Sequence, residues 1–591
     1  MSDEHIAKLK RRRRNRRILL VVLAVLVALV AWGAYLAYSA LIAKREIQAA
    51  VASASSLGAG AVSGDVNATK SALGQMGGHV DKAYAQTGNP LWKPLEFIPY
   101  YGSDVKAVRE SVRIMADVSD NALPQLESAL DTMQVKDFGV SNGRIALPGL
   151  ADAAENLRLA SESLTQANTE FQRLDGTHVA SLTRMLGDAQ ERFSTAASLM
   201  DGVSRFAQTA PAMFDLDRSG AHSYLIIGEN NAEARASGGL PASWGVMTVD
   251  DGAISISDFI ADTAIAQQDE PVTPLTDEEQ SLFGDKLATI AHDVNITPDF
   301  TRTGVIARAM WEKTQGQSVD GVIAVDPVFL QQLLGVTGPV TLSDGTTLDG
   351  SNAAQTLMHD EYYRTDDHAA QDAFFAEAAS ATFRLATASN ALDASRVLSL
   401  FPKAAANGHV KLWLADSGLQ RQLENTALGG TLSRAAGEPT VGVYVNNASQ
   451  SKMDWYLDRK ATATYVRTMA DGSREYDVHI TMTNTFDAAD AASTPQYVLG
   501  DGIDGLTGGR NATLLYVTAP ADGRLVSWRF SDGSQFDNYL TLDGLTVGVK
   551  RVELDPGQRL EASVRVRTSN QVSAGSGDGL AIRETPRIRD E

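Results

Sequence analysis

Cysteine is absent from this chain, and its absence removes several kinds of chemistry at once. Without thiols the protein has no disulfide, no cysteine nucleophile and no cysteine-based metal site, so its stability must come from ordinary hydrophobic cores. Histidine is also scarce, with 9 residues scattered along a chain of 591. We therefore do not expect a metal centre built from closely spaced histidines.

Two motifs that mark common enzyme classes are missing as well. The sequence contains no GxxxxGK[ST] phosphate loop and no HExxH zinc helix. Catalytic residues are therefore not identified by a standard motif, and whether the chain is an enzyme stays open at this point.

The N-terminus carries the clearest signal in the sequence. Residues 1–17 end in the basic run KLKRRRRNRR, and the segment from Ile18 to Ala43 then contains no charge. An uncharged run of this length exceeds the roughly 20 residues that a helix needs to cross a hydrocarbon core. It also exceeds the apolar region of a secretory signal, and no convincing cleavage site follows it. We expect residues 18–43 to be a transmembrane helix; the alternative is a nucleic-acid-binding arm followed by a buried helix.

The basic cluster sets the expected orientation. Basic residues beside a membrane span stay in the cytoplasm, so residues 1–17 should be cytoplasmic and the bulk of the chain extracellular. Residues 18–591 contain 44 basic and 70 acidic residues. Because this surplus of negative charge repels polyanions, no nucleic-acid partner is expected. The sequence predicts a single-pass protein of the cell membrane.

The composition changes along the exported part and predicts a multidomain α+β protein. Alanine-rich and leucine-rich periodicity predicts a helical stalk or bundle over residues 44–215. Residues 216–440 alternate strands and helices, which is typical of a layered α/β domain, and Asp251-Gly252 indicates a hairpin within it. Seven strand-like runs over residues 441–570 predict a β-sandwich. The polar, glycine-rich tail 571–591 is expected to be disordered.

A polar cluster in the α/β region is the first candidate site. Asn230, Asn231, Glu233 and Arg235 precede the doublet Gly238-Gly239. An arginine fork beside a flexible glycine turn can hold an anion, because glycine admits positive φ and close backbone approach. The alternative is structural: Glu233 and Arg235 pair with each other, and the glycines only shape a turn.

A second candidate site lies in the segment MHDEYYRTDDHAAQD, where four carboxylates surround Arg364. Asp366 and Asp367 stand before a predicted helix, so they cap it or, alternatively, ligate a divalent cation such as magnesium while Arg364 holds a phosphate. Asp262 is a further candidate metal ligand, and with Asp258 it has the alternative of an exposed loop or cap residue. The flanking carboxylates Asp360 and Glu361 belong to the same group.

The stretches around these residues resemble a known family. LIIGENNAEARASGGLPASWGVMTVDDGAI, VDGVIAVDPVFLQQLLGVTGPVTL and VYVNNASQSKMDWYLDR are similar to the domain of unknown function 4012 family, with Asn230 to Gly239 as the most specific element. The resemblance covers most of residues 90–570 and implies a bacterial membrane protein. It implies no reaction.

The chain also has a fainter similarity to the LytR-CpsA-Psr family, and this similarity implies a reaction. Those proteins, anchored by one N-terminal helix, transfer a glycopolymer phosphate from a polyprenyl-pyrophosphate carrier to peptidoglycan, with arginines on the pyrophosphate and aspartates on magnesium. This chain departs from their pattern, because Ser237-Gly238 stands where an aspartate is expected and Ile260-Ala261-Asp262-Thr263 lacks an arginine. Two hypotheses follow: a phosphotransferase-like protein handling lipid-linked glycopolymer, or a non-catalytic envelope scaffold that binds glycan, peptidoglycan or protein.

Overall fold

A computed structural model describes residues 3–63, 66–141, 143–174, 176–388, 394–424, 426–500, 502, 505–572 and 579–589. The chain divides into two compact units. Unit 1 comprises Met1–Met133 and Asp152–Ser204, and unit 2 comprises Gln134–Ala151 and Arg205–Glu591. Each unit is described separately below.

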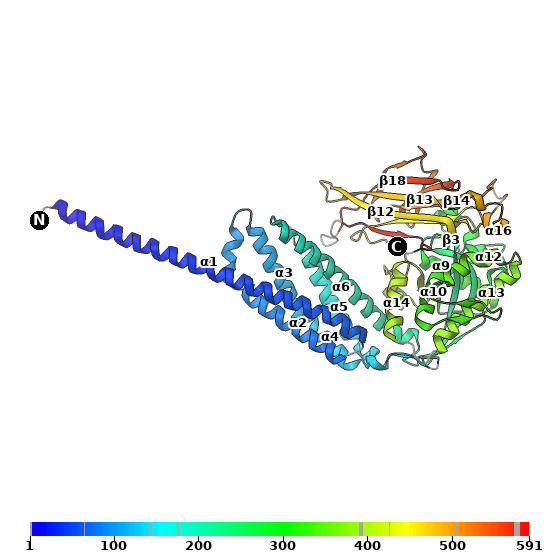
Figure 1. The fold of residues 1–591 in the computed structure, drawn as a ribbon, viewed down its shortest axis with the longest axis horizontal. Helices are drawn as coiled ribbons and strands as arrows, with labels where there is room; N and C mark the ends of the chain where they lie inside the picture. The colour runs from blue at the N-terminus through cyan, green and yellow to red at the C-terminus, as the bar shows by residue number, and fades with distance from the viewer. Residues whose placement is uncertain are drawn as a thin grey trace. The chain divides into compact units, whose positions relative to one another are not determined.

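Unit 1 is helical, and its helices pack through a small apolar core. Ile114, Val118 and Phe171 are buried in this core, and Leu164 packs against it. The N-terminal part of α1 projects beyond the other helices of the unit, and its C-terminal part runs beside α2 (Figure 1). The elements are α1 (Asp3–Ser63), α2 (Val66–Thr87), η1 (Pro90–Phe97), α3 (Gly102–Asn121), α4 (Leu123–Thr132), α5 (Leu150–Gln172) and α6 (Ala180–Met213).

Helix α1 carries the segment expected to span a membrane. Within the described residues, Leu23–Ala54 is long and apolar enough to cross a bilayer, with a mean hydropathy of 2.0. Leu23, Leu26 and Val30 are more than half exposed, as lipid-facing side chains would be. The helix is thus consistent with a single-pass membrane protein.

Unit 2 is built around a mixed sheet of eight strands. The long hairpin β3 (His222–Arg235) and β4 (Gly238–Asp250) forms its centre, and β3 pairs in parallel with β7 (Gly321–Val325). The strand order is β1-β2-β5-β4-β3-β7-β10, with β6 on β4. The remaining strands are β1 (Gly139–Ser141), β2 (Arg144–Ala146), β5 (Ala253–Ile256), β6 (Ile260–Ala261) and β10 (Val410–Leu414).

The predicted hairpin at Asp251-Gly252 is confirmed. These two residues join β4 to β5, with φ angles of 46° and 75°. Both values lie in the left-handed region that a two-residue hairpin turn needs, and aspartate and glycine tolerate it best.

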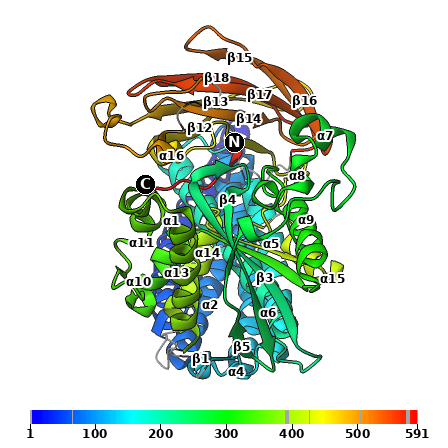
Figure 2. The same ribbon diagram turned by 90° about the vertical axis from the view of Figure 1, so that its right-hand side faces the viewer.

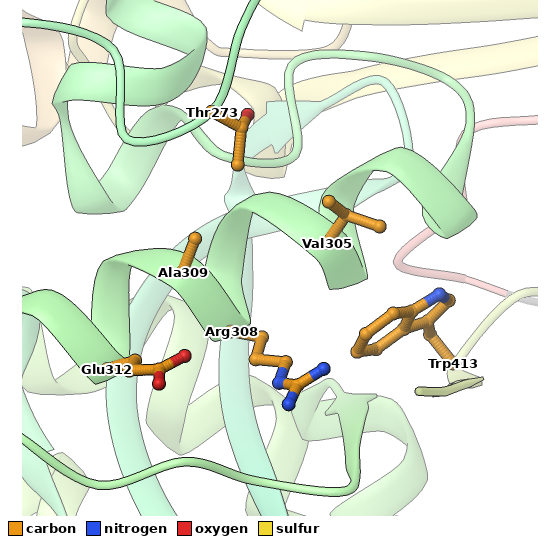
Figure 3. Close-up of a pocket in the computed structure, with 6 residues that line it drawn as sticks. All are labelled: Thr273, Val305, Arg308, Ala309, Glu312 and Trp413. Atoms are coloured by element: carbon orange, nitrogen blue, oxygen red, sulfur yellow. The ribbon is translucent and has the colours of Figure 1, made fainter. Parts of the chain in front are cut away.

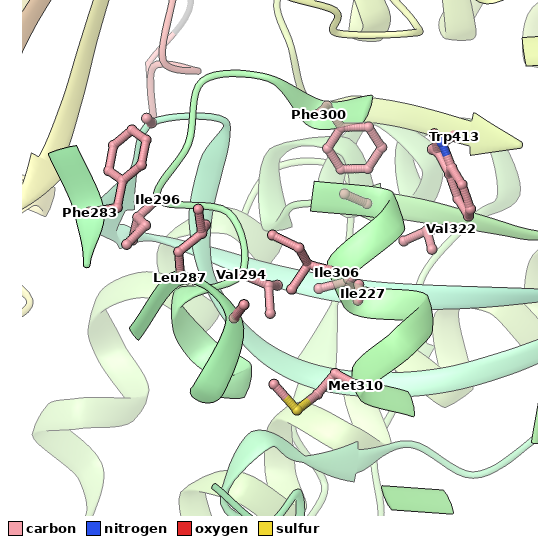
Figure 4. Close-up of a cluster of buried hydrophobic side chains, with 14 of the residues drawn as sticks. Ile227, Phe283, Leu287, Val294, Ile296, Phe300, Ile306, Met310, Val322 and Trp413 are labelled. Carbon is pink, nitrogen blue, oxygen red and sulfur yellow. The ribbon is translucent and has the colours of Figure 1, made fainter. Parts of the chain in front are cut away.

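Helices cover both faces of the central sheet (Figure 2). Successive residues of β3 point to opposite faces, so Leu225 and Ile227 enter one core and Ile226 the other. The first core, shown in Figure 4, receives Phe300, Ile306 and other side chains from one set of helices. That set is α7 (Asp277–Phe283), α8 (Lys286–Thr289) and α9 (Phe300–Gln315); the opposite set is α10 (Pro327–Thr337), α13 (His368–Ala388) and α14 (Ala394–Ala406).

Two further sheets, one mixed and one antiparallel, lie across one end of unit 2 and share a core (Figure 2). Each of the seven predicted strand-like runs forms a strand, and β16 adds one that the sequence did not indicate. The five-stranded sheet contains β16 (Asn538–Leu542), β17 (Leu545–Leu554), β14 (Asn511–Thr518), β11 (Thr440–Asn447) and β19 (Ala581–Glu584), and the four-stranded sheet contains β12 (Leu457–Thr468), β13 (Arg474–Asn484), β18 (Arg559–Arg567) and β15 (Arg524–Phe530).

Two expectations about chain segments were wrong. Residues 139–146, expected to lie within the helical stalk, form β1 and β2 at the edge of the central sheet, where Arg144 pairs with Ala253. The tail was expected to be disordered, but Ala581–Glu584 pair in parallel with β11. Tertiary pairing supplied the backbone partners that the local composition did not suggest. Residues 573–578 of the tail lie outside the described residues.

Candidate functional site

The Asn230–Gly239 stretch forms the closed end of the β3–β4 hairpin. The strand register shifts between Asn230 and Ala234, so the intervening residues bulge out of the ladder. The turn itself is made by Ala236 and Ser237, and not by the glycine doublet as expected. Gly238 begins β4, opposite Arg235.

Both glycines are required for close approach and not for positive φ. A Cβ on Gly238 would collide with the Glu229 carboxylate, and a Cβ on Gly239 would collide with the backbone of Asn230. The doublet therefore lets the hairpin close over the bulge.

The predicted pairing of Glu233 with Arg235 is present and is part of a larger buried cluster. Arg235 donates to Glu233 Oε1 at 3.1 Å and to Asp293 Oδ1 at 3.2 Å. Lys452 donates to Glu233 Oε2 at 2.6 Å. The Arg235 and Glu233 side chains are each 7% exposed, so their charges are neutralised by each other and not by water.

The charges in this cluster are held in their ionised forms. Burial by itself would raise the pKa of Glu233, but the charges of Lys452 and Arg235 outweigh it and lower that pKa to about 2. Burial likewise disfavours the cations, yet Glu233 raises the pKa of both Lys452 and Arg235 above their ordinary values. Mutual attraction in a site shielded from water accounts for both directions.

The two asparagines fasten the bulge to its surroundings. Asn230 Nδ2 donates to the Tyr362 hydroxyl at 2.6 Å, and Asn231 Nδ2 donates to Asp326 Oδ2 at 3.0 Å. Asn230 also accepts from the Ala232 amide at 3.0 Å. Both side chains are buried, and these contacts hold the backbone in place.

The bulge is also bonded to the C-terminal sheets. Asp454 of η6 (Met453–Tyr456) accepts from the Ala234 amide at 2.9 Å and from Asn447 and Asn511, each at 2.8 Å. Asn446 accepts from the Ala236 amide at 2.7 Å. A single network of hydrogen bonds therefore joins the central hairpin to β11 and β14.

The buried cluster continues into a series of residues, linked by contacts or by adjacency in the chain, that we call the polar ring. Arg235 contacts Asp293, whose neighbour His292 bonds Asp262 at 3.0 Å. Thr263 donates to Asp372 Oδ2 at 3.2 Å. The ring centres of His368 and Tyr497 lie 4.5 Å apart. Lys452 Nζ lies 5.1 Å from the Tyr497 ring centre and bonds Glu233.

Part of the polar ring faces solvent. Tyr497 on α16 (Gln496–Leu499) is 43% exposed, and the His292 side chain is 42% exposed. Lys286, whose Nζ lies 3.9 Å from Asp293 Oδ2, is exposed as well. The hydrogen bond that His292 Nδ1 donates to Asp262 raises the pKa of His292, which favours the charged imidazolium. The ring thus has a buried ionic base and an exposed rim of imidazole, phenol and ammonium groups.

Arg364 makes its interactions away from the polar ring. Its Nε lies 2.7 Å from Glu361 Oε2, it pairs with Asp344, and its guanidinium stacks 4.6 Å from the Phe374 ring centre. Two carboxylates thus already neutralise this cation. Arg364 is nevertheless 46% exposed at its side chain.

The three predicted metal ligands do not form one set. Asp367 caps α13 by accepting from the amides of Ala369 and Ala370, Asp366 is exposed, and Asp262 pairs with His292. Within the part of the chain that the structure describes, no group of three or more acidic or histidine side chains is placed to hold a metal ion. These residues do not fit magnesium, and no chemistry is derived through it.

The other carboxylates have local partners. Asp258 pairs with Arg384 at 2.6 Å, and Asp360 lies 2.7 Å from His359 Nδ1. Both are surface contacts of the kind that the alternative interpretation expected.

Several members of the polar ring were not identified from the sequence. His292, Asp293 and Tyr497 stand in no recognisable pattern, and His368 lies in the quoted segment MHDEYYRTDDHAAQD without having been selected as a site residue. Only the fold brings Asp293 to Arg235. Lys452 lies in VYVNNASQSKMDWYLDR, one of the stretches that carried the resemblance, which was the one available signal.

A separate cavity of about 340 Å³ lies on α9 (Figure 3). Arg308 and Trp413 line it, together with Thr273, Val305, Ala309 and Glu312. Arg308 donates to Ser318 Oγ at 3.0 Å. None of the residues predicted from the sequence lines this cavity.

Comparison with known proteins identifies one family. Residues 219–362 match the family described as "Protein of unknown function (DUF4012)". The matched segment begins just before β3 and contains the hairpin, its bulge and the His292–Asp262 pair. No curated protein and no solved structure is significantly similar to the chain.

Proposed function

Residues 219–362 match the DUF4012 family, and on this basis we propose a function for the chain. We propose that it is a membrane-anchored envelope protein whose polar ring binds glycan. In this proposal α1 spans the membrane, residues 1–17 are cytoplasmic, and the remainder is extracellular. Unit 2 then presents a layered α/β domain with a C-terminal β-sandwich to the cell wall.

The charge balance of the polar ring is the observation that supports binding over transfer. The ring contains two permanent cations, Arg235 and Lys452, and Lys286 lies at its edge. Its carboxylates are those of Glu233, Asp293, Asp262 and Asp372. A site that grips pyrophosphate needs an excess of positive charge, because phosphate carries several negative charges. Here the buried cations are already paired.

Sugars suit such a ring better than phosphates do. Hydroxyl groups both donate and accept hydrogen bonds, so they can use carboxylates and cations of the rim alike. The exposed face of Tyr497 adds an apolar surface on which a sugar ring can lie. We therefore infer that peptidoglycan or the glycan of a lipid-linked precursor is the ligand class.

Binding of soluble peptidoglycan fragments to the full chain in detergent tests the proposal. We expect saturable binding that weakens at least fivefold in Tyr497→Ala, since losing an aromatic contact costs about 1 kcal/mol or more. Tyr539→Ala is the matched control, because Tyr539 is 50% exposed on β16, away from the ring. Arg235→Ala is unsuitable, because it would leave Glu233 and Asp293 buried without their partner.

The proposal would be contradicted if the wild type showed no saturable binding. It would also be contradicted if Tyr497→Ala and Tyr539→Ala reduced the affinity equally. Thermal unfolding of each variant shows that its fold is intact.

The His292–Asp262 pair supports a second candidate, phosphoryl transfer from a lipid-linked glycopolymer. An exposed imidazole oriented by a carboxylate is the usual arrangement of a general base. In its neutral form, which the raised pKa shifts to higher pH, His292 would take the proton of an attacking glycan hydroxyl, whose oxygen bonds to phosphorus as the bond to the polyprenyl phosphate breaks. Release of polyprenyl phosphate from a polyprenyl-pyrophosphate-linked glycan, lost in His292→Gln with binding retained, would favour this candidate. Binding without release favours the first.

A further inference from the structure

An exposed apolar loop stands between α2 and α3 in unit 1. It comprises Asn89, η1 and residues 98–101, and we call it the aromatic loop. Phe97 is 85% exposed, Tyr100 62% and Tyr101 53%, and the side chains of Leu91 and Ile98 are also exposed. So many large apolar side chains on one short surface segment mark a site of contact with another apolar phase.

The aromatic loop is fastened to α1 by three hydrogen bonds. Trp32 Nε1 donates to the Leu91 carbonyl at 3.0 Å. Asn89 Nδ2 donates to the Tyr35 hydroxyl at 3.0 Å, and Trp92 Nε1 donates to Ser39 Oγ at 3.2 Å. The partners on α1 all lie between residues 32 and 39, so the loop is held at one level of that helix.

The loop also has a defined shape. Glu96 pairs with Arg109 of α3, and the Arg109 Nε donates to the Thr87 carbonyl at 2.8 Å. The Gly102 amide donates to the Ile98 carbonyl at 2.8 Å. A Cβ at Gly102 would collide with the Glu96 backbone, so only glycine fits there. The exposed side chains are therefore presented by a fixed backbone.

If the hydrocarbon core begins at the basic cluster, as the proposed anchoring has it, the loop is held at the level of the outer membrane interface. The uncharged segment begins at Ile18, directly after the basic cluster. A hydrocarbon core of about 30 Å takes roughly 20 residues at about 1.5 Å each, and it therefore ends near residue 37. Residues 32–39 straddle that end, where tryptophan and tyrosine side chains are favoured.

We propose that the aromatic loop inserts into the lipid surface beside α1, as a second membrane contact of this protein. This rests on the proposed anchoring by α1. Phe97 and Ile98 enter the acyl boundary, and Tyr100 and Tyr101 place their hydroxyls among the headgroups. Insertion to the depth of an interfacial helix, about 5–10 Å, leaves the backbone polar groups of the loop within reach of water and headgroups.

The absence of cysteine makes the test direct, because a single introduced thiol can be labelled. The full chain is labelled with a polarity-sensitive fluorophore in three separate variants, Phe97→Cys, Leu26→Cys and Met185→Cys. Each is reconstituted in phosphatidylcholine–phosphatidylglycerol vesicles with and without lipids brominated in the acyl chains. Met185 on α6 is the matched control, because it is 62% exposed but belongs to no apolar loop.

We expect brominated lipid to quench the probe at Phe97 at least twofold, as at Leu26, and to leave the probe at Met185 unchanged. Quenching at Leu26 without quenching at Phe97 overturns the loop proposal and leaves the anchor intact. A blue-shifted but unquenched Phe97 probe also overturns it, because a protein then covers the loop. No quenching at Leu26 overturns the anchor and the loop proposal together.

Discussion

Glu233 is the residue on which the polar ring depends, since it bonds both Arg235 and Lys452. Its pairing with Arg235 was foreseeable, because the two residues lie close together in the sequence. Lys452 was not, because more than two hundred residues separate it from Glu233. Local sequence thus indicated half of the ionic cluster, and the long-range half required the fold.

Asp299 gives a residue-scale prediction about pH. Burial, reinforced by the charge of Asp543, raises the pKa of Asp299 from 3.8 to about 6. Because the folded pKa lies above the unfolded value, the stabilisation is complete below about pH 4 and is lost as pH rises through about 6. At pH 7 the buried carboxylate therefore destabilises unit 2 by about 2–3 kcal/mol.

Replacing Asp299 by asparagine should remove that cost. Asp299 caps α9 through the Thr301 amide, and asparagine caps a helix equally well. We expect Asp299→Asn to raise the calorimetric unfolding temperature at pH 7 and to match the wild type near pH 4. An unfolding temperature that falls at both pH values would show that the carboxylate is stabilising.

Gly238 gives a second prediction at this scale. Alanine there would press its methyl group against Glu229, so Gly238→Ala should destabilise unit 2 by about 2–3 kcal/mol. Gly335 on α10 is the matched control, because it is exposed and a Cβ there meets only ordinary contact. Gly335→Ala should be neutral or slightly stabilising. Equal denaturant midpoints for the two variants would contradict the close approach.

At the scale of elements, turns were easier to predict than edges. The Asp251-Gly252 hairpin followed from two adjacent residues whose backbone preferences match the turn. Strand β19 could not be foreseen, because β11, with which it pairs, lies far back in the chain. Thr585, which follows β19, donates to the Ala236 carbonyl at 2.9 Å and accepts from the Val445 amide at 3.0 Å. The tail is therefore held in place by hydrogen-bond partners that its own composition does not predict.

In the sequence, the stretch GNPLWKPLEFIPYYG that contains the aromatic loop has the prolines and glycines of an interruption between helices. Proline and glycine predict where a helix stops, but not which surface the intervening side chains face. Its position became interpretable once Trp32, Tyr35 and Ser39 of α1 were seen to bond it. The position of the loop on α1 thus indicates its role more clearly than its own residues do.

At the scale of the whole molecule, the proposed topology makes a prediction that cells can test. The natural chain contains no thiol, so Tyr539→Cys and Ser2→Cys each introduce a single label site. We expect a membrane-impermeant maleimide to label the exposed Tyr539 position in intact cells and Ser2 only after permeabilisation. The reverse pattern would place the acidic bulk in the cytosol and remove the basis for an envelope ligand.

Asp454 makes the central hairpin dependent on the C-terminal part of unit 2. Its buried carboxylate accepts bonds from the central hairpin and from both β11 and β14. A chimaera that replaced everything after residue 440 would lose Asp454 together with Asn447 and Asn511, so the group at risk is the Ala234 amide, which is left without its acceptor if the new part carries no equivalent carboxylate. Any replacement for the C-terminal sheets must therefore supply an acceptor at this position.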